Sequence, residues 1–399
     1  MSAERWAWMR AETPVLARRA YLNTGFSGPM TNAVAEAMER RIRIELEDGP
    51  TTRHVLDDAR ETRTRLQAQF AQVFGADPEE VALTSSTGMG VSIVMAGLEL
   101  EPGDRILTSS VEHGSGAVPL YHARELHGAE VEFVAVGAND SDGEIVERFA
   151  SAIDERTRVV MLSEIAYSTG QLLPIPAIAE VAHRVGACVV IDGAQTGGHI
   201  PLDVRAMGAD AYAIPVQKWF CGPRGLGALY VCPDWLPRVT PSLVDVSHAE
   251  EWDLFGAFTP KRDVAGKFQL SATPPVLAAG AEVALQQYLD SGPQAVFDRV
   301  RELNRIAERR FERIDGVAVE SPRSEAARTG LFCFSAAGLD ATELAPYLQA
   351  EHQVVTRAVR EFNFIRLSLH VFNTEADIER AAVGVEQALR EGIPAAVAS

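Results

Sequence analysis

A single lysine, Lys218, lies between an apolar run, 211–216, and a glycine-rich turn that leads into a second apolar run, 226–231. In an α/β protein this pattern places a lysine at the end of a strand, where its amine can form a Schiff base with an aldehyde. An isolated lysine in a loop rich in Gly and Pro is more often a surface residue. The functional interpretation therefore depends on what lies beside it.

An aspartate, Asp192, ends the apolar run Val189-Val-Ile-Asp192, which reads as a buried strand. A carboxylate in that position can pair with a protonated pyridine nitrogen, and a Schiff-base lysine with such a partner is what pyridoxal phosphate requires. The two residues together predict a pyridoxal phosphate (PLP) site. Lys218 would bond the aldehyde, and Asp192 would keep the ring nitrogen protonated.

Apolar strands alternate with helical segments between residues 80 and 192, which predicts a mostly parallel sheet covered by helices on both faces. Ligands of such sheets bind at the carboxyl ends of the strands. The candidate residues all follow predicted strands: Thr87, His113, Tyr167, Asp192 and Lys218.

The rest of the chain frames this α/β unit. Helical spacing is expected over 31–48, 55–74 and 277–315. We predict an N-terminal arm (1–20), a large PLP-binding domain (21–262) and a small C-terminal α+β domain (263–399). The aromatic-rich segment 235–268 loses the regular alternation and is expected to form a lid over the site.

Composition excludes several classes of partner. The net charge is −18, which opposes nucleic acid and anionic membranes, since both require basic patches. The four cysteines have no metal-ligand spacing, so no metal site is expected, and a reduced cytoplasm suits them. Neither a signal peptide nor a membrane-spanning run is evident.

Four motifs together carry a family resemblance: Asp192-Gly-Ala-Gln195, Gln217-Lys-Trp219 with its glycine-rich turn, Glu112-His113, and Arg366-Leu-Ser-Leu-His-Val-Phe-Asn-Thr374. With them the chain resembles PLP-dependent enzymes of fold type I, in the class V aminotransferase and cysteine desulfurase group. The resemblance covers most of residues 20–390. It implies a large domain with a mostly parallel sheet and a smaller α+β domain.

The resemblance also implies roles around the cofactor ring. Lys218 would be the Schiff-base lysine and move the α-proton, Asp192 would pair with the ring nitrogen, and Gln195 would bond the ring oxygen O3′. His113 would stack on the pyridine face, although a capping or surface histidine is the alternative.

Further roles follow at the two ends of the cofactor. Thr87, Gly88 and Gln217 would hold the phosphate at a helix N-terminus, although an ordinary Ser/Thr cap would look the same. Thr273 would reach the phosphate from a neighbouring subunit, which implies a homodimer with shared active sites.

Arg366 resembles the arginine that binds the substrate α-carboxylate through two parallel hydrogen bonds, and a surface ion pair is its alternative. Asn23 and Tyr167 are expected to contact the substrate.

Three positions depart from the family pattern. Gln217 stands where relatives usually have histidine, Pro215 where serine is frequent, and Tyr167 where many have an asparagine near O3′. Because of the changes at positions 215 and 217, one phosphate contact is lost or supplied by other residues.

The segment 354–366 has no cysteine, so the nucleophile that desulfurases of this group carry there is missing, and Cys333 lies inside an apolar strand. The nearest resemblance is to cysteine and cystine carbon–sulfur lyases, which eliminate the β-thiolate and yield pyruvate, ammonia and a thiol or persulfide. Alternatives at the same centre are transamination, epimerisation and decarboxylating deamination. A non-catalytic scaffold is opposed by the joint presence of Lys218, Asp192 and Arg366.

Overall fold

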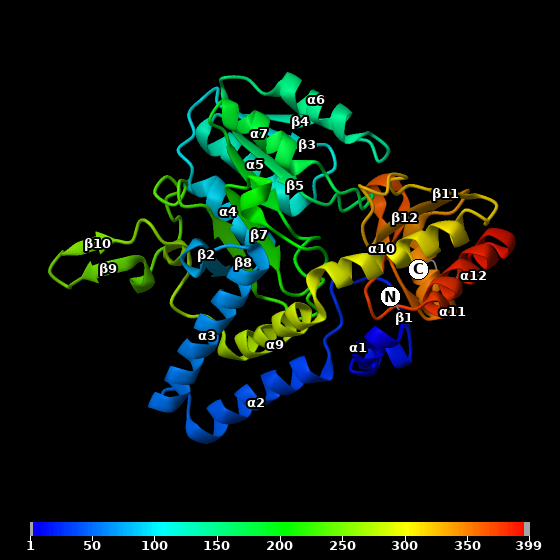
Figure 1. Ribbon diagram of the computed structural model, residues 1–399, viewed down its shortest axis with the longest axis horizontal. Coiled ribbons are helices and arrows are strands. Elements are labelled where there is room, and N and C mark those ends of the chain that lie inside the picture. The colour runs from blue at the N-terminus through cyan, green and yellow to red at the C-terminus, as the bar shows by residue number, and fades with distance from the viewer. Residues whose placement is uncertain (1–2, 395–399) are drawn as a thin grey trace.

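The computed structural model describes residues 3–394, which are built around a large mixed sheet and a smaller antiparallel sheet (Figure 1). The large sheet has seven strands in the order β2 (Val81–Thr84), β8 (Gly227–Val231), β7 (Ala211–Pro215), β6 (Cys188–Asp192), β5 (Thr157–Ser163), β3 (Arg105–Ser109) and β4 (Glu130–Val134). Only β8 runs antiparallel to its neighbours. The predicted mostly parallel sheet is therefore confirmed.

Each face of this sheet buries its own apolar cluster, because successive strand residues point to opposite sides. Val190 packs with α4 (Thr87–Gly97) and α5 (Gly114–His127) on one face. Ile191 packs with α3 (Arg53–Phe74), α6 (Asp142–Ala152) and α7 (Ile175–Arg184) on the other. The sheet is thus covered on both faces, and its loops at the carboxyl ends are left to form a site.

Small residues let the helices approach the sheet closely. A Cβ on Gly90 of α4 would lie 2.7 Å from the Cβ of Ala213 on β7, a contact too short for any side chain. Because Gly90 has no Cβ, the first turn of α4 can lie directly against β7. Ser86 caps that turn by accepting a hydrogen bond from the Met89 amide at 3.1 Å.

The smaller sheet has the order β11 (Val317–Val319), β12 (Leu331–Ala336), β15 (Phe364–Ser368) and β14 (Arg357–Val359), all antiparallel. The helices α11 (Ala341–His352) and α12 (Glu375–Glu391) pack against it through one apolar cluster. The N-terminal strand β1 (Ala20–Tyr21) pairs in parallel with β13 (Val354–Val355), next to this sheet.

The stretch 277–315, which was expected to be helical, is helical up to Phe311 except at Gly292. It consists of two helices, α9 (Pro275–Ser291) and α10 (Pro293–Phe311), separated by Gly292 at φ +77°. Proline directly after this glycine begins the second helix. Helix α9 packs on α2 (Asn32–Asp48) and α3, beside the large sheet. The domain boundaries at residues 20 and 262 stay predictions.

The segment after β8 is not wholly irregular. It contains a two-stranded hairpin of β9 (Ala249–Trp252) and β10 (Phe258–Pro260), which projects away from the large sheet in Figure 1. The remaining short elements are α1 (Ala7–Ala11), α8 (Val204–Met207) and the 3₁₀ turns Ala3–Trp6, Pro14–Ala17, Pro78–Glu80, Val246–His248, Ala265–Phe268 and Arg360–Phe362. Within residues 3–394, no helix has the length and apolarity needed to cross a membrane.

Candidate active site

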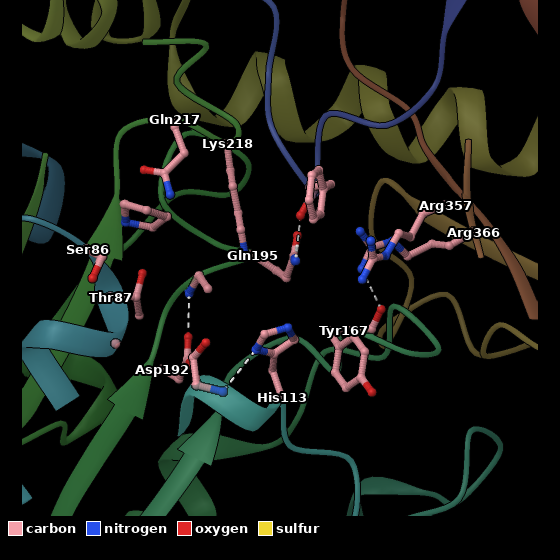
Figure 2. A pocket seen from close by; sticks show the side chains of 16 residues that line it. Ser86, Thr87, His113, Tyr167, Asp192, Gln195, Gln217, Lys218, Arg357 and Arg366 are labelled. Atoms are coloured by element: carbon pink, nitrogen blue, oxygen red, sulfur yellow. Dashed lines mark hydrogen bonds between the residues drawn. The ribbon is translucent and has the colours of Figure 1, made fainter. Parts of the chain in front are cut away.

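A cavity of about 200 Å³ opens at the carboxyl ends of the large sheet, between that sheet and strands β14 and β15 (Figure 2). Nine of the predicted site residues line it: Thr87, Gly88, His113, Tyr167, Asp192, Gln195, Gln217, Lys218 and Arg366. They come from six separate parts of the chain. The parallel strands bring eight of them together because their carboxyl ends meet at one edge, and Arg366 comes from β15 of the smaller sheet.

Lys218 follows β7, and its side chain lines the cavity with its amine directed into it. Burial lowers the pKa of this amine to about 8, against the opposing attraction of Asp192. Burial raises the pKa of Asp192, and the Lys218 charge counteracts that rise. Asp192 Oδ1 accepts a hydrogen bond from the Ala194 amide at 2.8 Å, which fixes the carboxylate at the end of β6.

His113 both caps a helix and lines the cavity. Its Nδ1 accepts a hydrogen bond from the Ser115 amide at 3.1 Å at the start of α5. The edge of the Tyr167 ring meets the imidazole with 5.0 Å between centroids. Burial, and then the charge of Lys218, lower the pKa of His113. Because Nδ1 accepts a hydrogen bond, the ring proton lies on Nε2.

At the other end of the cavity, α4 begins with free backbone N–H groups. The hydroxyl Oγ1 of Thr87 and the amide Oε1 of Gln217 are both buried without a hydrogen-bond partner. Figure 2 places Gln217 on the same side of the cavity as Ser86 and Thr87. The donors available there, which are the Thr87 hydroxyl, the Gln217 NH2 group and the N–H groups at the helix N-terminus, are suited to an anion.

Two arginines lie at the opposite end. Arg366 is 2% exposed, donates from Nη1 to the Tyr167 carbonyl at 2.8 Å, and leaves its Nε without a partner. Burial, and then the charge of Arg357, lower the pKa of Arg366 to about 10. Arg357 lies over the ring of Phe26, 4.6 Å from its centroid.

Sequence reasoning missed Arg357, Phe26, Ser86 and Ser115, which all line the cavity. Arg357 lies in the segment 354–366, whose only predicted functional features were Arg366 and the lack of a cysteine. The direction of its side chain depends on the pairing of β14 with β15, which the sequence does not reveal.

Two predicted residues lie outside the cavity lining. Asn23 forms a backbone bridge with Ser368, and its Oδ1 is buried without a partner, while its neighbours Gly25 and Phe26 form the wall. Thr273 lies just before α9, and its predicted role belongs to a neighbouring subunit. Both assignments stay predictions.

The expected lid is wrong within a single chain. No residue of 235–268 is among those that line the described cavity. The hairpin carries its apolar side chains outward, with Phe255 96% exposed and Leu254 87% exposed. Hairpin pairing between β9 and β10 directs this segment away from its own site (Figure 1).

A buried carboxylate, Glu112, lies next to the site and is hydrogen-bonded to two of the strands that carry it. Its oxygens accept hydrogen bonds from the hydroxyls of Ser109 at 2.5 Å and Ser163 at 2.6 Å. Ser163 is the register partner of Asp192 on the neighbouring strand. Burial raises the pKa of Glu112 to about 7, and the charge of Asp192 adds to that rise.

Comparison with known proteins agrees with this arrangement. The chain is 27% identical to a probable cysteine desulfurase of Halalkalibacterium halodurans, over 92% of each protein. It is also 27% identical to an isopenicillin N epimerase of Streptomyces clavuligerus, over 90% of this chain and 92% of the relative.

Among solved structures, the cystine C–S lyase C-DES in complex with cysteine persulfide has a TM-score of 0.87 and 26% identity, over 94% of this chain and 99% of the lyase. A C-DES variant with glycine covalently linked to its PLP cofactor has a TM-score of 0.88.

The model of the family named aminotransferase class-V matches residues 32–381. These residues include the large sheet and every predicted site residue except Asn23. The resemblance inferred from the four motifs is thereby confirmed, and the chain belongs to the aminotransferase class-V family.

Proposed function

We propose that this protein is a PLP-dependent carbon–sulfur lyase that eliminates a thiol from cysteine or a cysteine S-conjugate and forms pyruvate and ammonia. One observation carries the choice of reaction. The cavity holds a lysine, an aspartate and two arginines, but none of its described lining residues is a cysteine. A reaction in which the sulfur leaves on the substrate fragment needs no enzyme thiol.

The polar side chains that line the cavity match the polar groups of PLP. The Thr87 hydroxyl, which is buried without a partner, can donate to a phosphate at the start of α4. The Gln217 side chain lines the same part of the cavity, and its NH2 group, not its oxygen, can donate to that anion. Asp192 fits the ring nitrogen and His113 the ring face. Gly116 leaves room there, since a Cβ on it would lie 3.3 Å from Asp192 Oδ2.

When bound, PLP supplies an electron sink for the bond that breaks at Cα. The protein supplies the rest. Arg366 and Arg357 bind the carboxylate and orient the amino acid. The amine of Lys218, with its pKa near 8, accepts the Cα proton, because a sizeable fraction is neutral at neutral pH. Asp192 keeps a negative charge opposite the ring nitrogen.

Desulfurase chemistry is the first alternative, because several relatives carry that name. It requires an accessible thiolate. Cys333 pairs in register with Arg366 but is 0% exposed, and burial raises the pKa of its thiol to about 12. Cys221 is also buried, with its pKa raised further by burial. Neither thiol meets the requirement.

Epimerisation, transamination and decarboxylating deamination use the same lysine and aspartate. The isopenicillin N epimerase relatives make epimerisation the strongest of the three. An epimerase needs a second proton donor on the opposite face of Cα. His113 and Tyr167 lie across the cavity from Lys218 in Figure 2, which keeps this alternative open.

We further propose a homodimer with shared active sites. The hairpin exposes Trp252, Leu254, Phe255 and Phe258, and solvent-exposed apolar groups at such density favour a protein partner. Thr273 would then reach the partner's phosphate site. The mass from light scattering tests the assembly, and Phe255→Asp should shift it toward the monomer.

A cytoplasmic location is proposed because all four cysteines are free thiols. Cell fractionation, with a periplasmic protein as the control marker, tests the location.

The reaction is tested by incubating the purified protein with cystine and with S-substituted cysteines. Equal amounts of pyruvate and thiol or persulfide are expected, and Cys333→Ser should keep full activity. Alanine as the product, with activity lost in Cys333→Ser, would show a desulfurase. A D-amino acid, or an aldehyde with loss of CO₂, would show one of the other reactions.

A further inference from the structure

Two hydrogen bonds fix the direction of the Gln195 side-chain amide. Trp219 donates from its indole Nε1 to Gln195 Oε1 at 2.9 Å. Gln195 Nε2 donates in turn to the Gly25 carbonyl at 2.9 Å. A reversed amide would place N–H against N–H at the indole and oxygen against oxygen at Gly25. Both bonds would be lost inside a buried site, so a single orientation is stable.

The orientation of the Gln195 amide determines which of its atoms faces the cavity. The Gln195 nitrogen carries two hydrogens, and the Gly25 carbonyl uses one of them. Gln195 also lines the cavity beside Lys218 and Asp192 (Figure 2). Its oxygen is turned toward Trp219, so the second N–H remains for a ligand. The group bound next to Gln195 must therefore be a hydrogen-bond acceptor, as a ring oxygen of PLP is.

Two buried histidines hold Trp219 in place. The indole is 1% exposed and stacks on His199 with 3.7 Å between centroids and 14° between planes. His370 stacks at 6.0 Å and 25°, and its Nε2 donates to the Trp219 carbonyl at 3.0 Å. Burial lowers the pKa of His370 to about 4, so the ring is neutral. The indole N–H is thus held toward Gln195.

His199 also holds the backbone of Gln195. The Gly330 amide donates to His199 Nε2 at 2.8 Å, so the ring proton lies on Nδ1 and is donated to the Gln195 carbonyl at 2.7 Å. Burial lowers the pKa of His199 to about 3. Gly330 and His370 come from the C-terminal part of the chain. The two histidines therefore hold both Gln195, in the loop after β6, and Trp219, the residue after Lys218.

We propose that Trp219 is a positioning residue that keeps the N–H of Gln195, and not its carbonyl, facing the ring oxygen of PLP. The inference rests on the proposed function only in taking PLP as the bound group. It does not depend on which bond of the substrate breaks. Trp219 acts through Gln195, because its own side chain does not line the cavity.

The test is Trp219→Phe, which keeps an aromatic ring between the histidines and removes the indole N–H. The readout is the pH midpoint of the visible absorption band of bound PLP. A donor beside the ring oxygen competes with the titrating proton for that oxygen. When this donor is lost, the ring oxygen binds the titrating proton more tightly. The midpoint should therefore move to higher pH by about half to one unit. The kcat should fall more than KM rises.

Trp6→Phe is the matched control. Trp6 is also buried, at 2% exposure, but its Nε1 has no hydrogen-bond partner. Its replacement removes a buried indole N–H that makes no hydrogen bond to Gln195, and it should leave the midpoint unchanged. A similar shift in both variants would overturn the proposal, because the effect would then be general to buried indoles.

A double variant tests whether Trp219 acts through Gln195. Gln195→Met alone should shift the midpoint, and adding Trp219→Phe should change it no further. Additive shifts would overturn the proposal, as would an unshifted midpoint in Trp219→Phe. If Trp219→Phe does not fold, nitrogen NMR of the wild-type indoles replaces it. One indole N–H should be slow to exchange with solvent and should move in Gln195→Met, and an unchanged set would overturn the proposal.

The midpoint is measured without substrate, so it separates this inference from the proposed reaction. The predicted shifts in a protein that yields no pyruvate would reject the lyase and support the positioning role. Pyruvate formation with an unshifted midpoint would do the reverse.

Discussion

Arg357 and Arg366 stand directly opposite each other on the antiparallel strands β14 and β15. Like charges in this relation destabilise a sheet, and here one of the two guanidinium groups is buried. Both line the same cavity, and Arg366 has an Nε without a partner. A bound carboxylate would neutralise part of this charge, so we propose that the pair binds the substrate carboxylate.

Arg366→Lys should therefore lower kcat/KM for amino-acid substrates about 100-fold, because a lysine does not reproduce two parallel hydrogen bonds to a carboxylate. Amine analogues that lack the carboxylate should be processed equally by both proteins. Steady-state kinetics on the two kinds of substrate measure this. Equal losses on both would refute carboxylate binding by Arg366.

Lys218 should be the residue that bonds PLP. Borohydride treatment of the loaded protein, followed by peptide mapping, should place the label on Lys218. Lys267, which is buried at 3% exposure and does not line the cavity, is the internal control and should stay unlabelled. A label on any other lysine would contradict the assignment.

The reaction of the apoprotein with PLP should accelerate with pH. Only the neutral amine attacks an aldehyde, and the pKa of Lys218 is lowered to about 8. Below pH 8 the rate should rise about tenfold per pH unit, and it should level off above, some two units earlier than for an ordinary lysine. Stopped-flow absorbance follows this. A rate that still climbs tenfold between pH 9 and 10 would contradict the lowered pKa.

Asp192→Asn should keep PLP bound and lose turnover by about three orders of magnitude, because a neutral amide does not hold the ring nitrogen protonated. Cofactor content by absorbance and initial rates measure the two effects separately. Near-normal turnover in this variant would show that the charge at the ring nitrogen is unimportant.

Thr87→Val should weaken the binding of PLP by about tenfold, since it removes a hydroxyl from the predicted phosphate site. Pyridoxal, which lacks the phosphate, serves as the control ligand, and its affinity should not change. Equal losses for the two ligands would place Thr87 elsewhere. Titration of the apoprotein by absorbance gives both constants.

Glu112→Gln should stabilise the apoprotein at pH 8 and have little effect at pH 4. The folded pKa of Glu112 is about 7, above the usual 4.5, so the folded state retains a proton that the unfolded state releases. The wild-type protein therefore loses stability as the pH rises from 4.5 to 7, and glutamine removes that loss. A difference in Tm that does not change with pH would contradict this.

The class of fold and the location of the site could be predicted from the sequence alone. The strand-and-helix rhythm determined the class of fold, because buried parallel strands are continuously apolar and end at one edge. The same rule placed Lys218, Asp192, His113 and Thr87 at one site before any coordinates. These residues follow strands directly, so short-range order was enough to locate them.

Other features depended on contacts between distant segments. Arg357 enters the cavity only because β14 pairs with β15, and the hairpin at 249–260 leaves it only because β9 pairs with β10. The same is true of Trp219, whose indole reaches Gln195 between two histidines from different parts of the chain. A residue's position at a strand end is a local property, whereas the direction of its side chain and its hydrogen-bond partner are set by long-range packing. Tertiary structure alone therefore decided how these side chains are oriented.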